Sequence, residues 1–380
     1  MFKTALAIRE RLAKDNPQVY EPNLAGSYYN LAILYYTIER FKECEAMYKS
    51  TIAIRERLAK ENPQAYEPDL ADSYNNLAVL YSDTQRFAES EAMHKSALAI
   101  RERLAKNNPQ AYEPDLARSY NNLANLYSDT QRFKESEEMH KSALAIYERL
   151  AKDHPQAYEP DLANSYYNLA ILYYTTERFK QSESMYKSAL AIYERLAKDN
   201  PQAYESVLAD SYENLAILYS DTQRFEECEE MYNSAIAIRV DLAQEDLQVH
   251  GPALAKSLNN LAVLYKNTQR FAESEEMYNS ALTIRECLAK DNPQVYEPGL
   301  ADSYNNLAVL YSDTQRFEEC EAMYKSALAI RERLAKDNPQ TYEPVLAVSY
   351  NDLAILYSDT QRFEECEAMF KTALAIRERL

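Results

Sequence analysis

Asparagine amides recur at two neighbouring positions of this sequence, with a constant spacing of 46 residues. The first row comprises Asn30, Asn76, Asn122, Asn168, Asn214, Asn260 and Asn306, and it ends in Asp352. The second row comprises Asn75, Asn121, Asn259, Asn305 and Asn351, with Tyr29, Tyr167 and Glu213 at the remaining places. Because an amide both donates and accepts hydrogen bonds, such rows could bind the backbone of an extended peptide. The alternative is that the amides tie adjacent helices together.

Apolar and acidic side chains follow the amides with the same spacing. The apolar row comprises Ile33, Val79, Ile171, Ile217, Val263, Val309 and Ile355, and Asn125 adds one further amide to it. The acidic row comprises Asp83, Asp129, Asp221, Asp313 and Asp359. Aspartates at such places commonly form turns, which is the interpretation we favour. If they instead border a binding surface, that surface would prefer lysine or arginine in its ligand.

The sequence contains no recognisable catalytic motif. His94 and His140 share a repeat position that holds tyrosine or phenylalanine elsewhere, and His154 and His250 replace loop residues. Phosphate-binding loops, dinucleotide-binding glycine motifs, nucleophile elbows and clustered metal ligands are absent from the sequence. We therefore expect no catalytic residue, no cofactor, no metal site and no enzymatic activity.

Composition limits the classes of partner and the compartment. Sixty acidic residues against 42 basic ones give a formal net charge of −18, which disfavours nucleic acid and favours basic partners. No apolar run approaches the roughly 18 residues that would span a membrane. The five cysteines show neither pairing nor metal spacing, so we expect a cytoplasmic protein with reduced thiols.

The whole chain is an array of one module. The serines that recur every 46 residues are Ser27, Ser73, Ser119, Ser165, Ser211, Ser257, Ser303 and Ser349. Stacked modules bury their cores against neighbours, so we expect one elongated domain over residues 1–380. Residues 1–21 would hold a partial helix B and a loop. The repeats would then be 22–67, 68–113, 114–159, 160–205, 206–251, 252–297, 298–343 and the truncated 344–380.

Each module contains two amphipathic helices. In 68–113, Leu70, Tyr74, Leu77 and Tyr81 mark one face of a helix A that begins at Glu67 and Pro68. A polar stretch at 82–85 ends it, and helix B runs from Phe87 to about residue 107. The expected lengths are about 16 and 22 residues, or about 24 and 33 Å. Two proline rows, beginning with Pro17 and Pro22, would mark the loop between modules and the start of the next helix A.

These strings resemble a known family. The segments Tyr74–Tyr81 (YNNLAVLY) and Ser96–Glu102 (SALAIRE), with Phe87 between them, are similar to the tetratricopeptide repeat and to its kinesin light chain branch. The resemblance implies an all-α fold: a right-handed α-solenoid, or superhelix, of tandem helix-turn-helix repeats. It also implies that the helices A line its concave surface.

Two departures from the family pattern concern the joints. The glycine usual between helices A and B is replaced by glutamine or glutamate, as at Gln85 and Glu39, so a left-handed turn there would be strained or avoided. The segment from Val240 to Pro252 drifts furthest from the other copies, which predicts a local bend or a loosened joint.

The resulting hypothesis is a non-catalytic protein–protein interaction scaffold. It would bind a peptide or partner protein, with a preference for basic residues, through the two asparagine rows and Asn125 on the concave surface. Residues 1–12 repeat residues 369–380, so the first alternative is head-to-tail self-association into a longer array. The second alternative is a sensor arm of a larger signalling protein. Sedimentation at several concentrations separates self-association from a monomeric scaffold.

Overall fold

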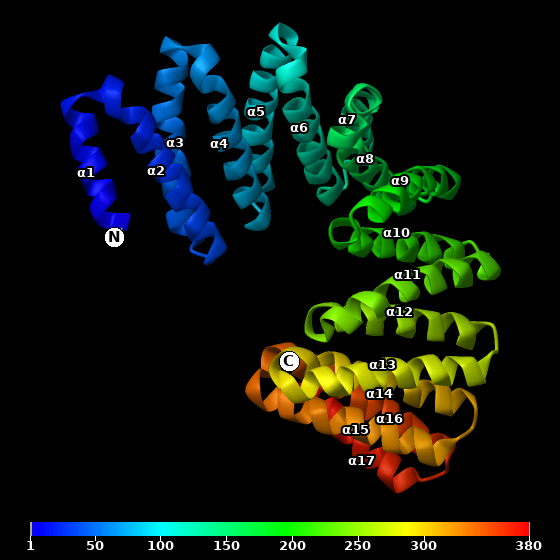
Figure 1. The fold of residues 1–380 in the computed structure, drawn as a ribbon. Coiled ribbons are helices and arrows are strands. Elements are labelled where there is room, and N and C mark those ends of the chain that lie inside the picture. Colours follow the sequence, from blue (N-terminus) through cyan, green and yellow to red (C-terminus); the bar gives the residue numbers. More distant parts are fainter. Residues whose placement is uncertain (1, 380) are drawn as a thin grey trace. The chain divides into compact units, whose positions relative to one another are not determined.

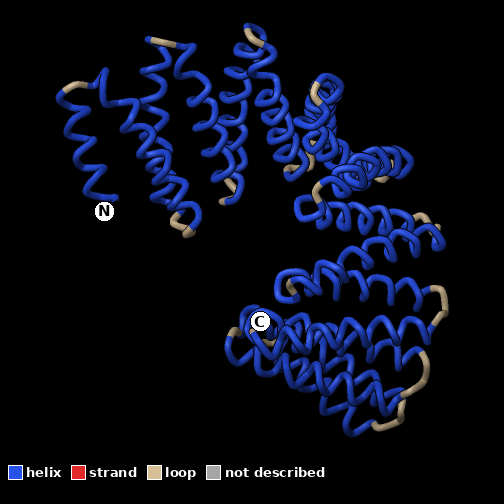
Figure 2. Tube along the Cα trace, in the orientation of Figure 1, coloured by secondary structure: helices blue, strands red, loops and turns tan. Residues whose placement is uncertain are grey.

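The computed structural model of the chain describes residues 2–379, which form helices and turns and contain no strand (Figures 1 and 2). Even-numbered helices correspond to helix A of each module and odd-numbered helices to helix B. The helices of the described range are α1 (Phe2–Asp15), α2 (Pro17–Thr37), α3 (Phe41–Glu61), α4 (Pro63–Asp83), α5 (Phe87–Asn107), α6 (Pro109–Asp129), α7 (Phe133–Asp153), α8 (Pro155–Thr175), α9 (Phe179–Asp199), α10 (Pro201–Asp221), α11 (Phe225–Glu245), α12 (Leu247–Asn267), α13 (Phe271–Asp291), α14 (Pro293–Asp313), α15 (Phe317–Asp337), α16 (Pro339–Asp359) and α17 (Phe363–Arg377).

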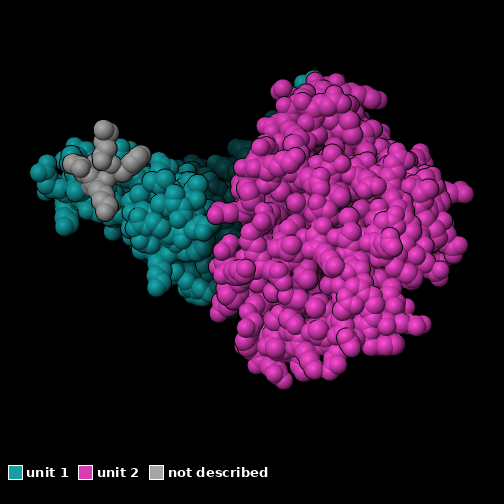
Figure 3. Space-filling model, turned by 90° about the horizontal axis from the view of Figure 1, so that it is seen from below, with its two compact units in different colours: residues 1–192 teal, residues 193–380 magenta. Residues whose placement is uncertain are grey.

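Two compact units, Met1–Ile192 and Tyr193–Leu380, divide the chain (Figure 3). Within each unit, successive helices pack side by side in chain order (Figure 1). This is the expected all-α solenoid of tandem helix-turn-helix repeats. The expected single domain over residues 1–380 stays a prediction.

The A-helices begin five residues earlier than expected. Pro63 is the first residue of α4 and Pro68 lies inside it, so both helices of this module are 21 residues long. A single residue, Asn62, connects α3 to α4, and its side chain accepts a hydrogen bond from the backbone N of Ala65 at 3.3 Å. The expected loop before residue 68 is therefore wrong, and so is the loop within residues 1–21, because α2 begins at Pro17.

Proline chemistry explains why these helices start early. At the first helical position proline removes no internal hydrogen bond. At the sixth position, Pro68 removes only the bond to the carbonyl of Gln64. Gln64 is exposed, so water can satisfy that carbonyl.

A left-handed residue ends each A-helix that the structure describes. Gln85 has φ 59°, and the equivalent residues Glu39, Gln131, Glu177, Gln223, Gln269, Gln315 and Gln361 have φ between 57° and 61°. The backbone N of Arg86 donates to the Tyr81 carbonyl at 2.7 Å, which closes the helix end. Of the two outcomes expected at this position, the strained left-handed turn is therefore the one adopted.

Glycine at this turn is expected to stabilise the protein. An L-residue in the left-handed region costs about 1–2 kcal/mol, a cost that glycine avoids. Glycine also makes the unfolded chain more flexible, which offsets part of this gain in stability. Gln131→Gly should therefore raise the free energy of unfolding by about 0.5–1 kcal/mol, as measured by urea denaturation. Gln110→Gly, in the first turn of α6, is the matched control and should lower it by a similar amount. If both variants lower the free energy of unfolding, the left-handed conformation of Gln131 is not strained.

Adjacent modules are joined by a recurring cluster of arginine, tyrosine and glutamate. The Arg86 guanidinium lies 4.2 Å from the Tyr81 ring centroid and donates to Glu45 of the preceding module at 2.7 Å. The Tyr81 hydroxyl donates to the same carboxylate at 3.1 Å. The bond from Arg86 helps lower the pKa of Glu45 to about 2. The cluster therefore stays ionised and holds each A-helix to the previous B-helix.

The divergent segment keeps the repeat geometry. Asp246 replaces the usual asparagine and accepts hydrogen bonds from the backbone N of Gln248 and Val249 at 3.0 and 3.1 Å. Leu247 packs against the core cluster around Leu254. Helices α11 and α12 each keep 21 residues, so the expected loosened joint is not seen.

Candidate partner-binding surface

One side of each A-helix carries a row of exposed and half-buried residues. In α4 this side comprises Asp69, Asp72, Asn76, Val79 and Asp83, whose spacing of three and four residues places them on one helix face. We call this face, together with its equivalents in the other A-helices, the A-face. It contains the first asparagine row, the apolar row and the acidic row. Neighbouring A-faces within a unit are joined by side-chain hydrogen bonds.

The two asparagine rows meet across the junctions between A-helices. Asn122 Nδ2 donates to Asn75 Oδ1 at 2.8 Å, and Asn306 Nδ2 donates to Asn259 Oδ1 at 2.8 Å. Where the second row holds another residue, Asn76 donates to the Tyr29 hydroxyl at 2.6 Å and Asn260 to Glu213 at 2.9 Å. The amides thus tie adjacent helices together. Since an amide has two donors and two acceptor lone pairs, one such bond leaves capacity for a partner.

Some predicted site residues have a larger structural role. Asn121 Nδ2 donates to Ser165 Oγ at 3.2 Å, and Asn121 Oδ1 lies 3.1 Å from His140 Nδ1. Burial lowers the pKa of His140 to about 4, so the ring is neutral at pH 7 and its Nδ1 carries the proton that Asn121 accepts. Asn121 is therefore engaged on both sides. Binding by the predicted asparagines stays a prediction.

The remaining predicted asparagines differ in exposure. Asn125 is exposed on α6, whereas Asn168, Asn214 and Asn351 are half-buried. Asn305 Oδ1 is buried and has no hydrogen-bond partner in the described part of the chain. Its counterpart in the next first-row position is Asp352, which as a carboxylate has no proton to donate. The amide row therefore changes character between α14 and α16.

The apolar row is accessible in both units. The exposed fractions are 42% for Ile33, 39% for Ile171, 37% for Val263 and 53% for Ile355. Val79, Ile217 and Val309 are half-buried. In α4, by contrast, the core side chains of Leu77 and Leu80 are 2% and 1% exposed. The row is thus an apolar surface of the A-face rather than part of the core.

The acidic row borders this surface. Asp83 is exposed at the last position of α4 and accepts a hydrogen bond from the Tyr36 hydroxyl of the preceding A-helix. The turn itself is made by Gln85 and by Thr84, whose Oγ1 donates to the Leu80 carbonyl at 2.8 Å. The carboxylate therefore points toward the neighbouring A-helix.

Buried arginines beneath the A-face were not anticipated from the sequence. Arg239 is 4% exposed and contacts Asp210 at 2.5 Å and the buried carboxylate of Glu213. Burial alone would raise the pKa of Glu213, but Arg239 and Lys256 outweigh it and hold the pKa below its usual value. Arg101 and Arg331 pair with Asp72 and Asp302 in the same way. The signal for these pairs was the recurrence of arginine at one helix B position, which only Tyr147 and Tyr193 interrupt between Arg55 and Arg331.

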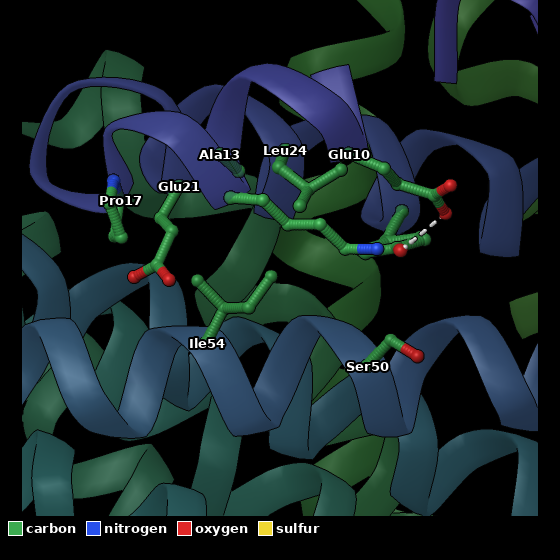
Figure 4. A pocket seen from close by; sticks show the side chains of 9 residues that line it. Glu10, Ala13, Pro17, Glu21, Leu24, Ser50 and Ile54 are labelled. Atoms are coloured by element: carbon green, nitrogen blue, oxygen red, sulfur yellow. Dashed lines mark hydrogen bonds between the residues drawn. The ribbon is translucent and has the colours of Figure 1, made fainter. Parts of the chain in front are cut away.

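A separate recess of about 500 Å³ lies on another side of α2, between α1 and α3 (Figure 4). Leu24, Glu21 and Ile54 line it, and none of them belongs to the A-face. Equivalent recesses occur beside α4, α10 and α16. Because it recurs with the module, the recess belongs to the packing of each repeat rather than to one ligand.

No group of three or more histidine, cysteine, aspartate or glutamate side chains is placed to hold a metal within residues 2–379. In the same range, no helix is both long and apolar enough to cross a bilayer.

The fold and its exposed helix faces define an α-helical repeat protein of the scaffold type. The tetratricopeptide repeat profile matches residues 23–103, 69–149, 115–195, 207–286 and 299–379. The chain therefore belongs to the tetratricopeptide repeat family, as the resemblance predicted. No curated protein matches the sequence.

Several solved structures are similar to this chain. BtubC (BKLC) from P. vanneervenii is 27% identical, with a TM-score of 0.52 over 65% of this chain and 91% of that chain. A signal transduction ATPase with a tetratricopeptide repeat sensor, from Pyrococcus horikoshii, is 14% identical, with a TM-score of 0.59 over 93% of this chain and 53% of that chain. A putative kinesin light chain from P. anserina with nearly identical repeats is 20% identical, with a TM-score of 0.47 over 59% of this chain and 98% of that chain.

Proposed function

We propose that this protein is a non-catalytic scaffold that holds a peptide segment of a partner protein against the A-face. The observation that carries the proposal is the exposed apolar row, with Ile33 and Ile171 42% and 39% exposed in one unit and Val263 37% exposed in the other. Tetratricopeptide repeats are generally interaction scaffolds rather than enzymes. The five free cysteines favour the cytoplasm as its compartment.

The chemistry beside the apolar row suits a polypeptide. Amides such as Asn76 and Asn122 retain donors and acceptors that match a peptide backbone. Carboxylates such as Asp83 and Asp129 are exposed beside them and would attract lysine or arginine in the partner. An apolar surface with amides on one side and carboxylates on the other favours an extended segment that is apolar and basic.

Substitutions borrowed from the protein's own repeats test the proposal. A phage-displayed library of random 16-residue peptides would be selected on the full chain, and the affinity of the selected peptides measured by fluorescence anisotropy. Ile33→Asn and Val263→Asn each introduce the residue that α6 carries as Asn125, so the fold should tolerate them. Loss of one apolar contact should weaken peptides bound in the same unit about tenfold.

Val240→Asn is the matched control, because Val240 is 37% exposed but lies on α11, away from the A-face. It should leave the affinity unchanged. The proposal would be wrong if the library yields no binder, or if the control weakens binding as much as the two A-face variants do.

A further inference from the structure

The A-face of the first unit differs from helix to helix in a regular way. Residues 27–41 and 165–179, which include the second halves of α2 and α8, are identical except for Ile38 and Thr176. The two intervening helices, α4 and α6, replace two of the four tyrosines of this segment: asparagine stands at the position of Tyr29 and serine at that of Tyr36. The four A-faces therefore form two similar outer helices around two different inner ones.

The outer helices each present an apolar, aromatic site. The α2 site comprises Ile33, Tyr36 and Phe41, with the two rings 6.2 Å apart between centroids. Ile33 is 42% exposed and Tyr36 is 36% exposed. Both side chains are therefore open to solvent rather than part of the core. The α2 site can receive a large apolar side chain of a partner.

The α8 site repeats this arrangement. It comprises Ile171, Tyr174 and Phe179, with the rings 6.1 Å apart. Ile171 is 39% exposed and Tyr174 is half-buried. The same residue types in the same geometry can receive the same kind of side chain.

The inner helices carry most of the charge. The A-faces of α4 and α6 hold five carboxylates: Asp69, Asp72, Asp83, Asp115 and Asp129. Three arginines lie against them, since Arg55 contacts Asp69 at 3.5 Å, Arg118 contacts Asp115 at 3.1 Å, and Arg101 contacts Asp72. Two negative charges remain in excess. The α2 face has no charged residue and the α8 face has only Asp161.

The four faces form a continuous surface within the unit. The bond from Asn76 to Tyr29 joins α4 to α2, the bond from Asn122 to Asn75 joins α6 to α4, and the bond from Asn121 to Ser165 joins α8 to α6. Packed helices lie about 8–10 Å apart, so three steps place the two sites about 24–30 Å apart. An extended chain advances about 3.3 Å per residue and covers this distance in about seven to nine residues.

We propose that the first unit binds an extended peptide with two large apolar side chains about seven to nine residues apart, separated by a basic stretch. One apolar side chain occupies the α2 site and the other the α8 site. Lysine or arginine between them faces the carboxylates of α4 and α6. This inference rests on the proposed function and adds the register and chemistry of the partner.

The peptides selected from the random library on the intact chain provide the test. Enriched sequences should carry two large apolar residues seven to eleven positions apart with net positive charge between them. Their affinity should fall about tenfold or more in Tyr36→Ser and in Tyr174→Ser, and further in the double variant. Serine is the residue at the equivalent Ser82 and Ser128, so these variants should keep the fold. Binding should also weaken as the salt concentration rises.

Conservative variants separate binding from structure. Tyr36→Phe loses the hydrogen bond to Asp83 but keeps the ring, so it should bind within about threefold of the unchanged protein, as should Tyr174→Phe. This inference would be overturned, and the proposed function left standing, by either of two results. The selected peptides could lack the pattern, or their affinity could be unchanged in both serine variants. A library that yields no binder would overturn both.

Discussion

Replacing Arg239 by methionine is expected to lower the free energy of unfolding of the second unit by about 3–5 kcal/mol. The variant leaves the carboxylate of Glu213, which is only 3% exposed, without its strongest partner. Asn260 at 2.9 Å, Ser257 at 3.2 Å and Lys256 at 3.2 Å remain, but the first two are neutral and Lys256 is itself largely exposed. A buried charge that loses its partner retains the cost of leaving water without the attraction that offset it.

The double variant Arg239→Met, Glu213→Asn is the informative control. Asparagine is the residue of this row at Asn75 and Asn259, so it suits the position. Removing both charges should restore stability to within about 1–2 kcal/mol of the unchanged protein. Hydrogen exchange of α10 to α12 should accompany urea denaturation, because repeat arrays can unfold in parts. If the single and double variants lose the same free energy of unfolding, the unpaired charge of Glu213 is not the cause of the loss.

Leu123→Ala is expected to cost about 2–5 kcal/mol, because it opens a cavity that the neighbouring helices cannot fully close. Leu123 is 2% exposed and packs with Leu126, Tyr127, Leu98 and Met139. The loss would be measured as a shift of the urea midpoint at an unchanged denaturant dependence.

Leu34→Ala is the matched control for the leucine substitution. Leu34 also lies on an A-helix but is 42% exposed, so its removal should cost about 1 kcal/mol or less. Comparable losses in the two variants would contradict the assignment of Leu123 to the core.

Local rules that hold in most helices misplaced the module boundaries. Proline in a helix interior normally predicts a break, so Pro68 suggested a helix start there rather than at Pro63. In the structure Asn62 alone ends α3 and begins α4, and exposure of the preceding turn makes the missing bond of Pro68 tolerable. The sequence leaves the turn at Gln85 open between two outcomes, and the structure shows the left-handed one, closed by the bond from the backbone N of Arg86 to the Tyr81 carbonyl.

The polar contacts between modules also could not be predicted from the sequence. Glu45, Tyr81 and Arg86 recur in the sequence, but nothing in their spacing of 36 and 41 residues says that they meet. The two interpretations of the asparagine rows could not be separated for the same reason. The bond between Asn122 and Asn75 is visible only once α4 and α6 lie side by side.

The amino-acid sequence alone determined the repeat, the all-helical fold, the apolar faces of both helices and the family. These properties follow from the spacing of residues along the chain, because a helix face is set by neighbours three and four positions away. Only the tertiary structure decided which polar residues pair across modules, which arginines are buried, and which row of the A-face stays open to a partner. Such contacts join residues tens of positions apart, and their strength depends on burial that local spacing does not encode.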